Sequence, residues 1–329
     1  MNCYLGIAIG GTKCIVSLGR ETDGELTILD SRRIPTADTP SPLETLGRLA
    51  DLGEELMKLH DTEISAVGIA CGSPLDSKRG VIQCPPNLPG WVDVPAAEFF
   101  SKRFGVPAYL ENDANAGALA EWRFGAAKGS ENAVFLTFGT GFGAGLIING
   151  RLYAGTHGMA GEIGHVRLSE RGPVGYGKEG SVEGFCSGGG IARLARGLCL
   201  EKLRQGEKPS LCPTEEALGS LSAASVAAAA KEGDALAKRI FELSGEMLGR
   251  TLAMIIDTLD PQVIVIGSIF ARAEELLRPA MERAIKAEAL PSLAADCRVV
   301  PAMLGDRVDE YEALTIASYN CGIFSGGKK

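Results

Sequence analysis

Two glycine-rich segments contain the residue types that a phosphate-binding turn needs. The first is Ile9–Lys13 (IGGTK), and the second is Thr137–Gly145 (TFGTGFGAG). Glycine lets backbone N–H groups approach a phosphate without a Cβ clash, while Thr12 offers a hydroxyl and Lys13 a cation. Each turn taken alone is more often structural, because Gly-Gly hairpin turns are common. The residues predicted to contact phosphate in the two segments are Gly10, Gly11, Thr12, Lys13, Thr137, Gly139, Thr140 and Gly141.

The glycine patterns do not fit the two commonest nucleotide-binding motifs. A dinucleotide-binding fingerprint requires a helix to begin at its glycines, whereas Leu146–Gly150 reads as a strand that ends in a hairpin turn. The stretch Gly172–Glu179 matches a P-loop except that Glu179 replaces the Ser or Thr that binds Mg²⁺, and no strand precedes it. A Rossmann domain and a P-loop are therefore both disfavoured.

Polar side chains elsewhere suit proton transfer or hydroxyl binding. Asn112 and Asp113 follow a short predicted strand and open a helix, where either residue type also serves as an ordinary cap. In a functional role, Asp113 would accept the proton of an attacking hydroxyl group. Glu162 and His165 lie three residues apart among glycines, but an isolated histidine is more often structural than catalytic.

The two halves of the chain begin with the same order of elements around these residues. Strands are predicted at Tyr4–Ile9, Cys14–Leu18 and Glu25–Ile34, and later at Val134–Phe138 and Ala144–Ile148, with a glycine turn after the first strand of each half. Two similar halves indicate two α/β domains with a cleft. Further helices are predicted at Leu43–Leu59, Ala96–Phe104, Asn112 to about Phe124, Ile191–Cys199, Ala223–Ala230, Asp234–Leu259 and near Asp309–Asn320, with strands at Ser65–Cys71, Ala108–Leu110, Arg151–Tyr153 and Val263–Ile266.

The composition excludes several classes of protein. With 329 residues, 45% of them hydrophobic and 22% charged, the chain is of globular type and long enough for two domains. The net charge of −8 gives no general attraction to nucleic acid or to anionic membranes. The nine cysteines lack the spacing of a disulfide scaffold, and no signal peptide or membrane span is evident, so we expect free thiols and a cytoplasmic protein.

The order of the motifs resembles the ROK family (repressors, open reading frames and sugar kinases), one branch of the actin-like ATPase superfamily. This resemblance implies duplicated ribonuclease-H-like domains that hold ATP between two glycine hairpins. We expect the N-terminal domain to comprise residues 1–111 and a C-terminal helix at about 309–323, and the second domain to comprise residues 112–308 with a helical insertion. The matching stretches are Ile9–Lys13, Asn87–Trp91, Glu111–Ala116, Gly139–Gly145, Gly161–His165 and Val265–Gly267.

The resemblance also implies an activity and a role for each matching residue. The chain is expected to be a glucokinase-like enzyme that transfers the γ-phosphoryl group of ATP, with Mg²⁺, to a hydroxyl of a hexose or N-acetylhexosamine. Asp113 corresponds to the general base, and Gly267 joins the nucleotide-binding residues. The residues that match sugar-binding positions are Asn87, Asn112, Glu162, His165 and Glu183.

The sequence departs from the family pattern at two places. Three zinc-binding cysteines of the family are replaced by Val174, Tyr176 and Ser181, and Cys186 is wrongly spaced, so we expect no structural zinc. In addition, Ala8 stands where the family has an aspartate that orients Mg²⁺ or its water shell. This leaves three alternatives, which are an active kinase with altered metal handling, a slow kinase, and a sugar-binding sensor without catalysis.

A DNA-binding repressor is a further function found in the family. The first predicted strand begins by Tyr4, which leaves no room for an N-terminal helix-turn-helix, and the acidic charge also disfavours a DNA reader. The expected partners are therefore a sugar and a nucleotide, with a homodimer possible by resemblance to the family.

Overall fold

A computed structural model describes residues 2–325 of the chain. The chain forms two compact units. The first contains Met1–Gly129, Leu152–Ala160 and Met303–Lys329, and the second contains Ser130–Arg151 and Gly161–Ala302. The domain boundary expected at residues 111 and 112 stays a prediction.

The first unit is built on a five-stranded mixed sheet with the order β3-β2-β1-β4-β7. The first three strands form the predicted antiparallel meander, and β4 and β7 extend it in parallel with β1. The strands are β1 (Asn2–Ile9), β2 (Lys13–Thr22), β3 (Glu25–Pro35), β4 (Ala66–Cys71) and β7 (Ala108–Asn112), with a small hairpin of β5 (Leu75–Asp76) and β6 (Val81–Ile82).

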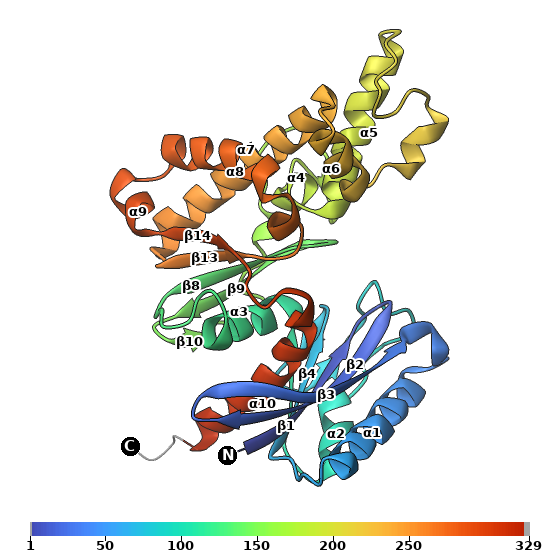
Figure 1. Cartoon of the computed structure of the whole chain (residues 1–329), viewed down its shortest axis with the longest axis vertical. Helices are drawn as coiled ribbons and strands as arrows, with labels where there is room; N and C mark the ends of the chain where they lie inside the picture. The colour runs from blue at the N-terminus through green and yellow to red at the C-terminus, as the bar shows by residue number, and fades with distance from the viewer. Residues whose placement is uncertain (1, 326–329) are drawn as a thin grey trace. The chain divides into compact units, whose positions relative to one another are not determined.

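Helices cover both faces of this sheet (Figure 1). Leu5 and Ile7 of β1 are buried in one core with Leu46 and Leu49 of α1 (Pro42–Leu59), as the alternation of side chains along a strand requires. On the other face, α10 (Val308–Ser325) contacts β1, β4 and α3 (Asp113–Phe124). A Cβ atom on Gly68 would lie 1.9 Å from the carbonyl oxygen of Ala313, so this glycine allows α10 to rest directly on the sheet. The remaining helix is α2 (Ala96–Phe104).

The second unit repeats this plan with the strand order β10-β9-β8-β13-β14. β8 and β9 form an antiparallel hairpin, and β13 lies parallel to both β8 and β14. The repeated opening predicted from the sequence is therefore confirmed. The strands are β8 (Ala133–Phe138), β9 (Phe142–Ile148), β10 (Arg151–Leu152), β13 (Val263–Ile266) and β14 (Arg298–Pro301).

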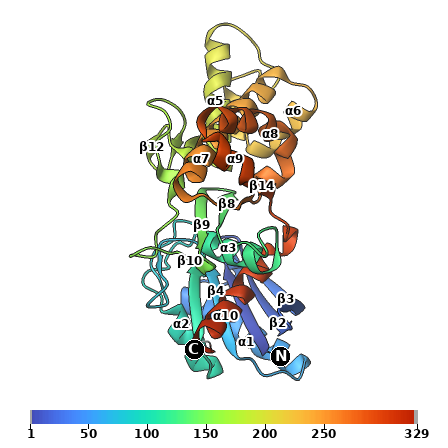
Figure 2. The same ribbon diagram turned by 90° about the vertical axis from the view of Figure 1, so that its left-hand side faces the viewer.

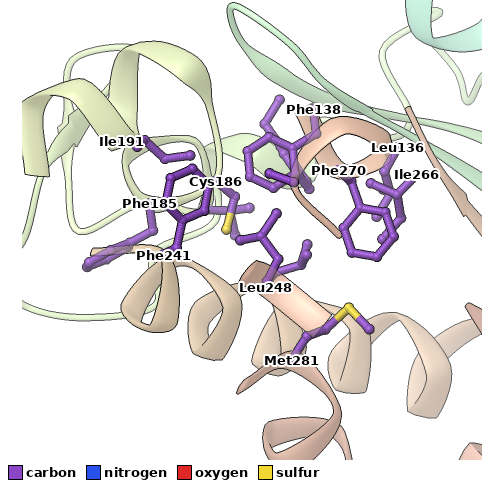
Figure 3. Close-up of a cluster of buried hydrophobic side chains, with 14 of the residues drawn as sticks. Leu136, Phe138, Phe185, Cys186, Ile191, Phe241, Leu248, Ile266, Phe270 and Met281 are labelled. Carbon is purple, nitrogen blue, oxygen red and sulfur yellow. The ribbon is translucent and has the colours of Figure 1, made fainter. Parts of the chain in front are cut away.

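A helical layer packs on this second sheet and closes its core. Phe138 of β8, Phe241 and Leu248 of α7, and Phe270 of α8 gather with other apolar side chains in the centre of this core (Figure 3). Figure 2 shows the helices of the layer from a second direction. They are α4 (Val182–Phe185), α5 (Gly188–Arg204), α6 (Ala223–Lys231), α7 (Ala235–Leu259), α8 (Ile269–Glu288) and α9 (Pro291–Asp296).

The predicted elements are present, and most differences are at their ends. The helix predicted at Ile191–Cys199 begins earlier, at Gly188, because the Ser187 hydroxyl accepts a hydrogen bond from the Gly190 N–H and caps a glycine-rich first turn. In the P-loop-like stretch, β11 (Val174–Gly175) and β12 (Lys178–Glu179) form a short hairpin, as expected for a segment that is not a P-loop. Within residues 2–325, no helix is long and apolar enough to cross a membrane.

Candidate active site

The first glycine turn connects β1 and β2 in the first unit. The turn is closed by a hydrogen bond from the Gly10 N–H to the Lys13 carbonyl oxygen at 3.0 Å. Thr36, which follows β3, holds the turn in place, since its hydroxyl donates to the Gly10 carbonyl oxygen at 2.6 Å. Gly11 lies against the predicted sugar ligand Asn87, because a Cβ atom there would be 2.5 Å from the Asn87 carbonyl oxygen. The turn and Asn87 are therefore neighbours.

A pocket of about 260 Å³ opens beside this turn, with all its lining residues in the first unit. It brings together the predicted phosphate ligands Gly10–Lys13, the predicted sugar ligand Asn87 and the predicted base Asp113. Two acids of α10, Asp309 and Glu312, also line it. No sequence motif pointed to these two side chains, which lie almost 200 residues after Asp113.

Asn112 and Asp113 mark the point where β7 ends and α3 begins. The Asn112 side-chain oxygen accepts a hydrogen bond from the Asn115 N–H at 2.8 Å, so the capping role considered for this residue is confirmed. Its side-chain NH₂ group makes no hydrogen bond to the part of the chain that the structure describes, so it can act as a donor. The Asp113 carboxylate accepts a hydrogen bond from the Ala114 N–H at 2.9 Å.

The surroundings of Asp113 favour its neutral form over its charged form. Its side chain is open to solvent through the pocket but is closely surrounded by protein atoms, and this desolvation raises its pKa despite the backbone hydrogen bonds. A carboxylate with a raised pKa is a stronger base than a fully hydrated one. The Asp113 carboxylate also lines the pocket. Asp113 is therefore suited to accept a proton.

Glu111 holds the segment at Asn112 and Asp113 in place through hydrogen bonds. One of its carboxylate oxygens accepts hydrogen bonds from the Ser77 hydroxyl at 3.1 Å, the Asn112 N–H at 2.9 Å and the Asn115 side chain at 3.0 Å. Burial raises the pKa of Glu111, and these hydrogen bonds oppose the shift. The sequence motif contains Glu111, but nothing in the sequence indicates that it contacts both asparagines.

Lys13 and the α10 acids form the charged side of the pocket. The Lys13 Nζ atom lies 2.5 Å from the Asp309 Oδ2 atom, which joins the glycine turn to α10. The pKa of Glu312 is raised well above its usual value, mainly by burial and then by the nearby carboxylates of Asp113, Asp309 and Glu121. Lys13 opposes this shift. The pocket thus combines one lysine with several carboxylates.

The second glycine turn has comparable features in the second unit. It connects β8 and β9, with a hydrogen bond from the Gly139 N–H to the Gly141 carbonyl oxygen at 3.1 Å. The N–H of Gly188, in the first turn of α5, donates to the Gly139 carbonyl oxygen at 2.8 Å. Thr140 is exposed at the tip. The Thr137 hydroxyl instead accepts a hydrogen bond from the Gly143 N–H at 2.9 Å and so stabilises the hairpin.

Gly267, which is predicted to bind nucleotide, lies near this second turn. Its N–H donates to the Leu136 carbonyl oxygen at 2.9 Å, at the point where β13 leads into α8. The neighbouring Ser268 has a positive φ of 55°, and a Cβ atom on Gly139 would lie 3.7 Å from its hydroxyl oxygen. Neither Ser268 nor Gly188 belongs to a motif that could have marked it in the sequence.

The three predicted sugar ligands of the second unit lie near the start of β9. Glu183 contacts this strand itself, and Glu162 and His165 belong to a loop that contacts it. The Glu183 carboxylate accepts a hydrogen bond from the Phe142 N–H at 3.2 Å. A Cβ atom on Gly164 would lie 2.0 Å from the Phe142 carbonyl oxygen, so the loop that carries Glu162 and His165 rests on the same residue. Glu162 and His165 are exposed. The structure therefore brings Glu162, His165 and Glu183 to one region beside the second glycine turn.

Residues at the positions aligned with the family's zinc ligands make contacts of other kinds. The His165 and Tyr176 rings pack edge to face with their centroids 6.2 Å apart, and the Ser181 hydroxyl caps α4. The Cys186 thiol is buried and donates to the Ser244 carbonyl oxygen at 3.7 Å. Over the described range 2–325, no three His, Cys, Asp or Glu side chains are grouped to hold a metal ion.

Comparison with known proteins identifies the family. The model of the ROK family matches residues 4–316, and the chain belongs to this family. It is 32% identical over 308 residues to a glucokinase of Halalkalibacterium halodurans, with 92% of this chain and 91% of the relative covered. The fold is that of the actin-like ATPases, as in the ROK hexokinase from Thermus thermophilus, with a TM-score of 0.79, 28% identity, and 98% and 99% of the two chains covered.

One similar structure contains both kinds of ligand expected for such a site. The ROK family glucokinase from Streptomyces griseus was solved in complex with glucose and AMPPNP, and it matches with a TM-score of 0.74 and 26% identity over 96% of this chain and 99% of that chain. Regulators are also among the relatives. The N-acetylglucosamine repressor of Escherichia coli is 32% identical over 248 residues, which cover 74% of this chain and 58% of the repressor.

Proposed function

We propose that this protein is an ATP-dependent sugar kinase that phosphorylates a hydroxyl group of a hexose or an N-acetylhexosamine. The observation that carries the proposal is the position of Asp113, whose pKa is raised, in one pocket with the Gly10–Lys13 turn. A phosphoryl transfer needs a base for the attacking hydroxyl and donors for the phosphate oxygens. Glucokinases among the relatives support the same reaction.

Asp113 is the residue that accepts the proton of the sugar hydroxyl as this oxygen attacks the γ-phosphorus. Its position at the first turn of α3 keeps the carboxylate in place through the Ala114 N–H. Asn112 uses its side-chain oxygen to cap the helix, so its NH₂ group can donate to a sugar oxygen. Asn87, Glu162, His165 and Glu183 are the further proposed sugar ligands.

The two glycine turns and Lys13 are the proposed phosphate-binding groups. Backbone N–H groups of the turns and the lysine cation stabilise negative charge on the phosphate oxygens. The proposed contacts come from Gly10, Gly11, Thr12 and Lys13 in the first unit and from Thr137, Gly139, Thr140, Gly141 and Gly267 in the second.

The residues of the pocket also fit a Mg²⁺ ion that accompanies ATP. Mg²⁺ in kinases is usually held by one or two carboxylates together with phosphate oxygens and water, and the Glu312 carboxylate is in the pocket without a hydrogen-bond donor among the described residues. When bound, the ion would neutralise charge on the phosphates. Glu312 and Asp113 are the residues that would hold it or its water.

The test is a panel of hexoses and N-acetylhexosamines incubated with the protein, ATP and Mg²⁺. We expect ADP release to be stimulated by at least one sugar, with a sugar phosphate as the product found by mass spectrometry. The second candidate function, a sugar sensor without catalysis, is favoured by Ala8 and by the repressors among the relatives. Sugar binding without any sugar-stimulated ADP release would support the sensor and contradict the kinase.

A further inference from the structure

The face of β1 that packs on α10 carries only small side chains near the pocket. Side chains alternate along a strand, so Gly6 and Ala8 point to the same face. A Cβ atom on Gly6 would lie 2.9 Å from the Leu314 backbone nitrogen and 3.0 Å from the Ala313 Cβ atom, which shows that this face meets α10. Ala8 lies two residues further toward the glycine turn, and it lines the same pocket as Glu312.

The close packing of α10 fixes where Glu312 can be. Ala70, which pairs with Ala8 in the parallel register of β1 and β4, belongs to one buried cluster with Ala313. Because Ala313 rests on the sheet, the residue just before it in the helix is held near the ends of β1 and β4. Glu312 therefore reaches the pocket from the helix that faces Ala8.

The Glu312 carboxylate is in a negatively charged region without a partner of its own. Asp113 and Asp309 line the same pocket, and among the side chains that the structure describes no hydrogen bond or ion pair to Glu312 is found. Lys13 is the cation that acts on Glu312, and its Nζ atom is already paired with Asp309 at 2.5 Å. The ionised form of a carboxyl group that is closely surrounded by protein and by other acids is costly, and a bound cation offsets that cost.

We propose that Glu312 supplies, from α10, the carboxylate that is missing at Ala8, and that it binds the Mg²⁺ ion of Mg·ATP directly or through a water molecule of that ion. This inference rests on the proposed kinase function and concerns only the residue that handles the metal. It predicts that the protein is an active kinase whose metal-binding carboxylate is on α10 instead of at position 8, and that Ala8 does not impair it. Glu312 would then strengthen metal binding but would not be needed for binding metal-free nucleotide.

The test measures metal binding directly with Glu312→Gln, which keeps the shape of the side chain and removes its charge. Mn²⁺ binding to the protein with AMPPNP is followed by electron paramagnetic resonance, and binding of AMPPNP without metal is followed by calorimetry. We expect Glu312→Gln to weaken Mn²⁺ binding by about 10- to 100-fold, as loss of metal-orienting groups usually does. Metal-free AMPPNP should bind at least as tightly as to the wild type, since a negative charge near the phosphates is removed.

Two further variants test whether an acid inside this pocket, rather than the net charge of the protein, decides the metal affinity. Ala8→Asp in the Glu312→Gln background should restore most of the Mn²⁺ affinity, because it returns an acid to the same pocket. The matched control is Glu98→Gln, which removes an exposed carboxylate on α2 of the same unit and should leave Mn²⁺ binding unchanged.

The outcomes distinguish the role of Glu312 from the proposed kinase function. If Glu312→Gln binds Mn²⁺ with wild-type affinity, and the protein binds AMPPNP and phosphorylates a sugar, the proposed role of Glu312 is wrong. The proposed kinase function is then unaffected. If Ala8→Asp in the Glu312→Gln background recovers no Mn²⁺ affinity, the proposal that Glu312 takes the place of an acid at position 8 is wrong. A wild-type chain that binds no nucleotide contradicts the kinase itself and the metal-binding role of Glu312 with it.

Discussion

Lys13 and Asp309 form an ion pair in which the Nζ and Oδ2 atoms are 2.5 Å apart, although the residues are 296 positions apart in the sequence. The pair connects the first glycine turn to α10 and places a lysine beside the candidate phosphate site. Its side chains are 47% and 33% exposed, so solvent screens the attraction and the pair adds little to stability. Its importance is therefore expected in nucleotide binding rather than in folding.

Replacing Lys13 should weaken nucleotide binding while leaving the fold intact. We expect Lys13→Met to raise the KM for ATP by about tenfold, the loss of one charge-assisted contact, and to change the free energy of unfolding by less than about 1 kcal/mol. The control is Lys102→Met, which removes an exposed lysine that pairs with Glu98 on α2. An unchanged KM for ATP in Lys13→Met would show that Lys13 does not contact the nucleotide.

The raised pKa of Glu312 predicts a pH dependence of stability in the metal-free protein. The native state holds the Glu312 proton to a higher pH than the unfolded state does, so its contribution is fully present below the usual value of 4.5. That contribution is lost as pH rises toward the raised native pKa. We therefore expect the Tm of Glu312→Gln to exceed the wild-type Tm by an amount that grows as the pH is raised from 4.5.

The measurement for this prediction is a series of thermal unfolding curves of both proteins without metal or nucleotide. Glu98→Gln again serves as control, because its exposed carboxylate is outside the pocket. A Tm difference between Glu312→Gln and wild type that is constant with pH would mean that the pKa of Glu312 is the same in the native and unfolded states, and would contradict the raised native pKa.

Glu111 should act as a positioning residue for the Asn112–Asp113 corner. Glu111→Ala removes an acceptor from three donors, two of which belong to Asn112 and Asn115. The donor of Asn115 is then left buried without that partner, and the other two are left partly buried. We expect a loss of about 2–5 kcal/mol in the free energy of unfolding, measured with urea. Ser77→Ala removes only one of the three donors and should cost about 1 kcal/mol. Equal losses in the two variants would contradict a shared network.

The repeated plan of the fold could be predicted from the sequence because it depends on local patterns. The alternation of Leu5, Ile7 and Ile9 marks a strand, and the glycines that follow mark the turn, so the meander is predicted correctly. Its second strand is longer than predicted and ends at Thr22 rather than Leu18. The helix predicted at Ala96–Phe104 has the observed bounds. Asn112 and Asp113 were found for the same reason, since a capping residue and a helix start are local features.

The charged side of the pocket could not be predicted, because it depends on contacts between distant segments. Nothing in Val308–Ser325 indicates that Asp309 meets Lys13 or that Glu312 lies near Ala8, since helix α10 is buried on several sides and shows no simple apolar stripe. The alanine at position 8 is visible in the sequence. The nearby carboxylate of Glu312 was visible only in the structure.

The most direct test of the kinase is a comparison of the wild type with Asp113→Asn on the best sugar of the panel. We expect kcat for sugar phosphorylation to fall by about 10²- to 10⁴-fold, the usual contribution of a general base, while sugar binding measured by calorimetry stays within a few-fold. Wild-type kcat in Asp113→Asn would contradict Asp113 as the base. Absence of sugar-stimulated ADP release in the wild type itself would contradict the kinase.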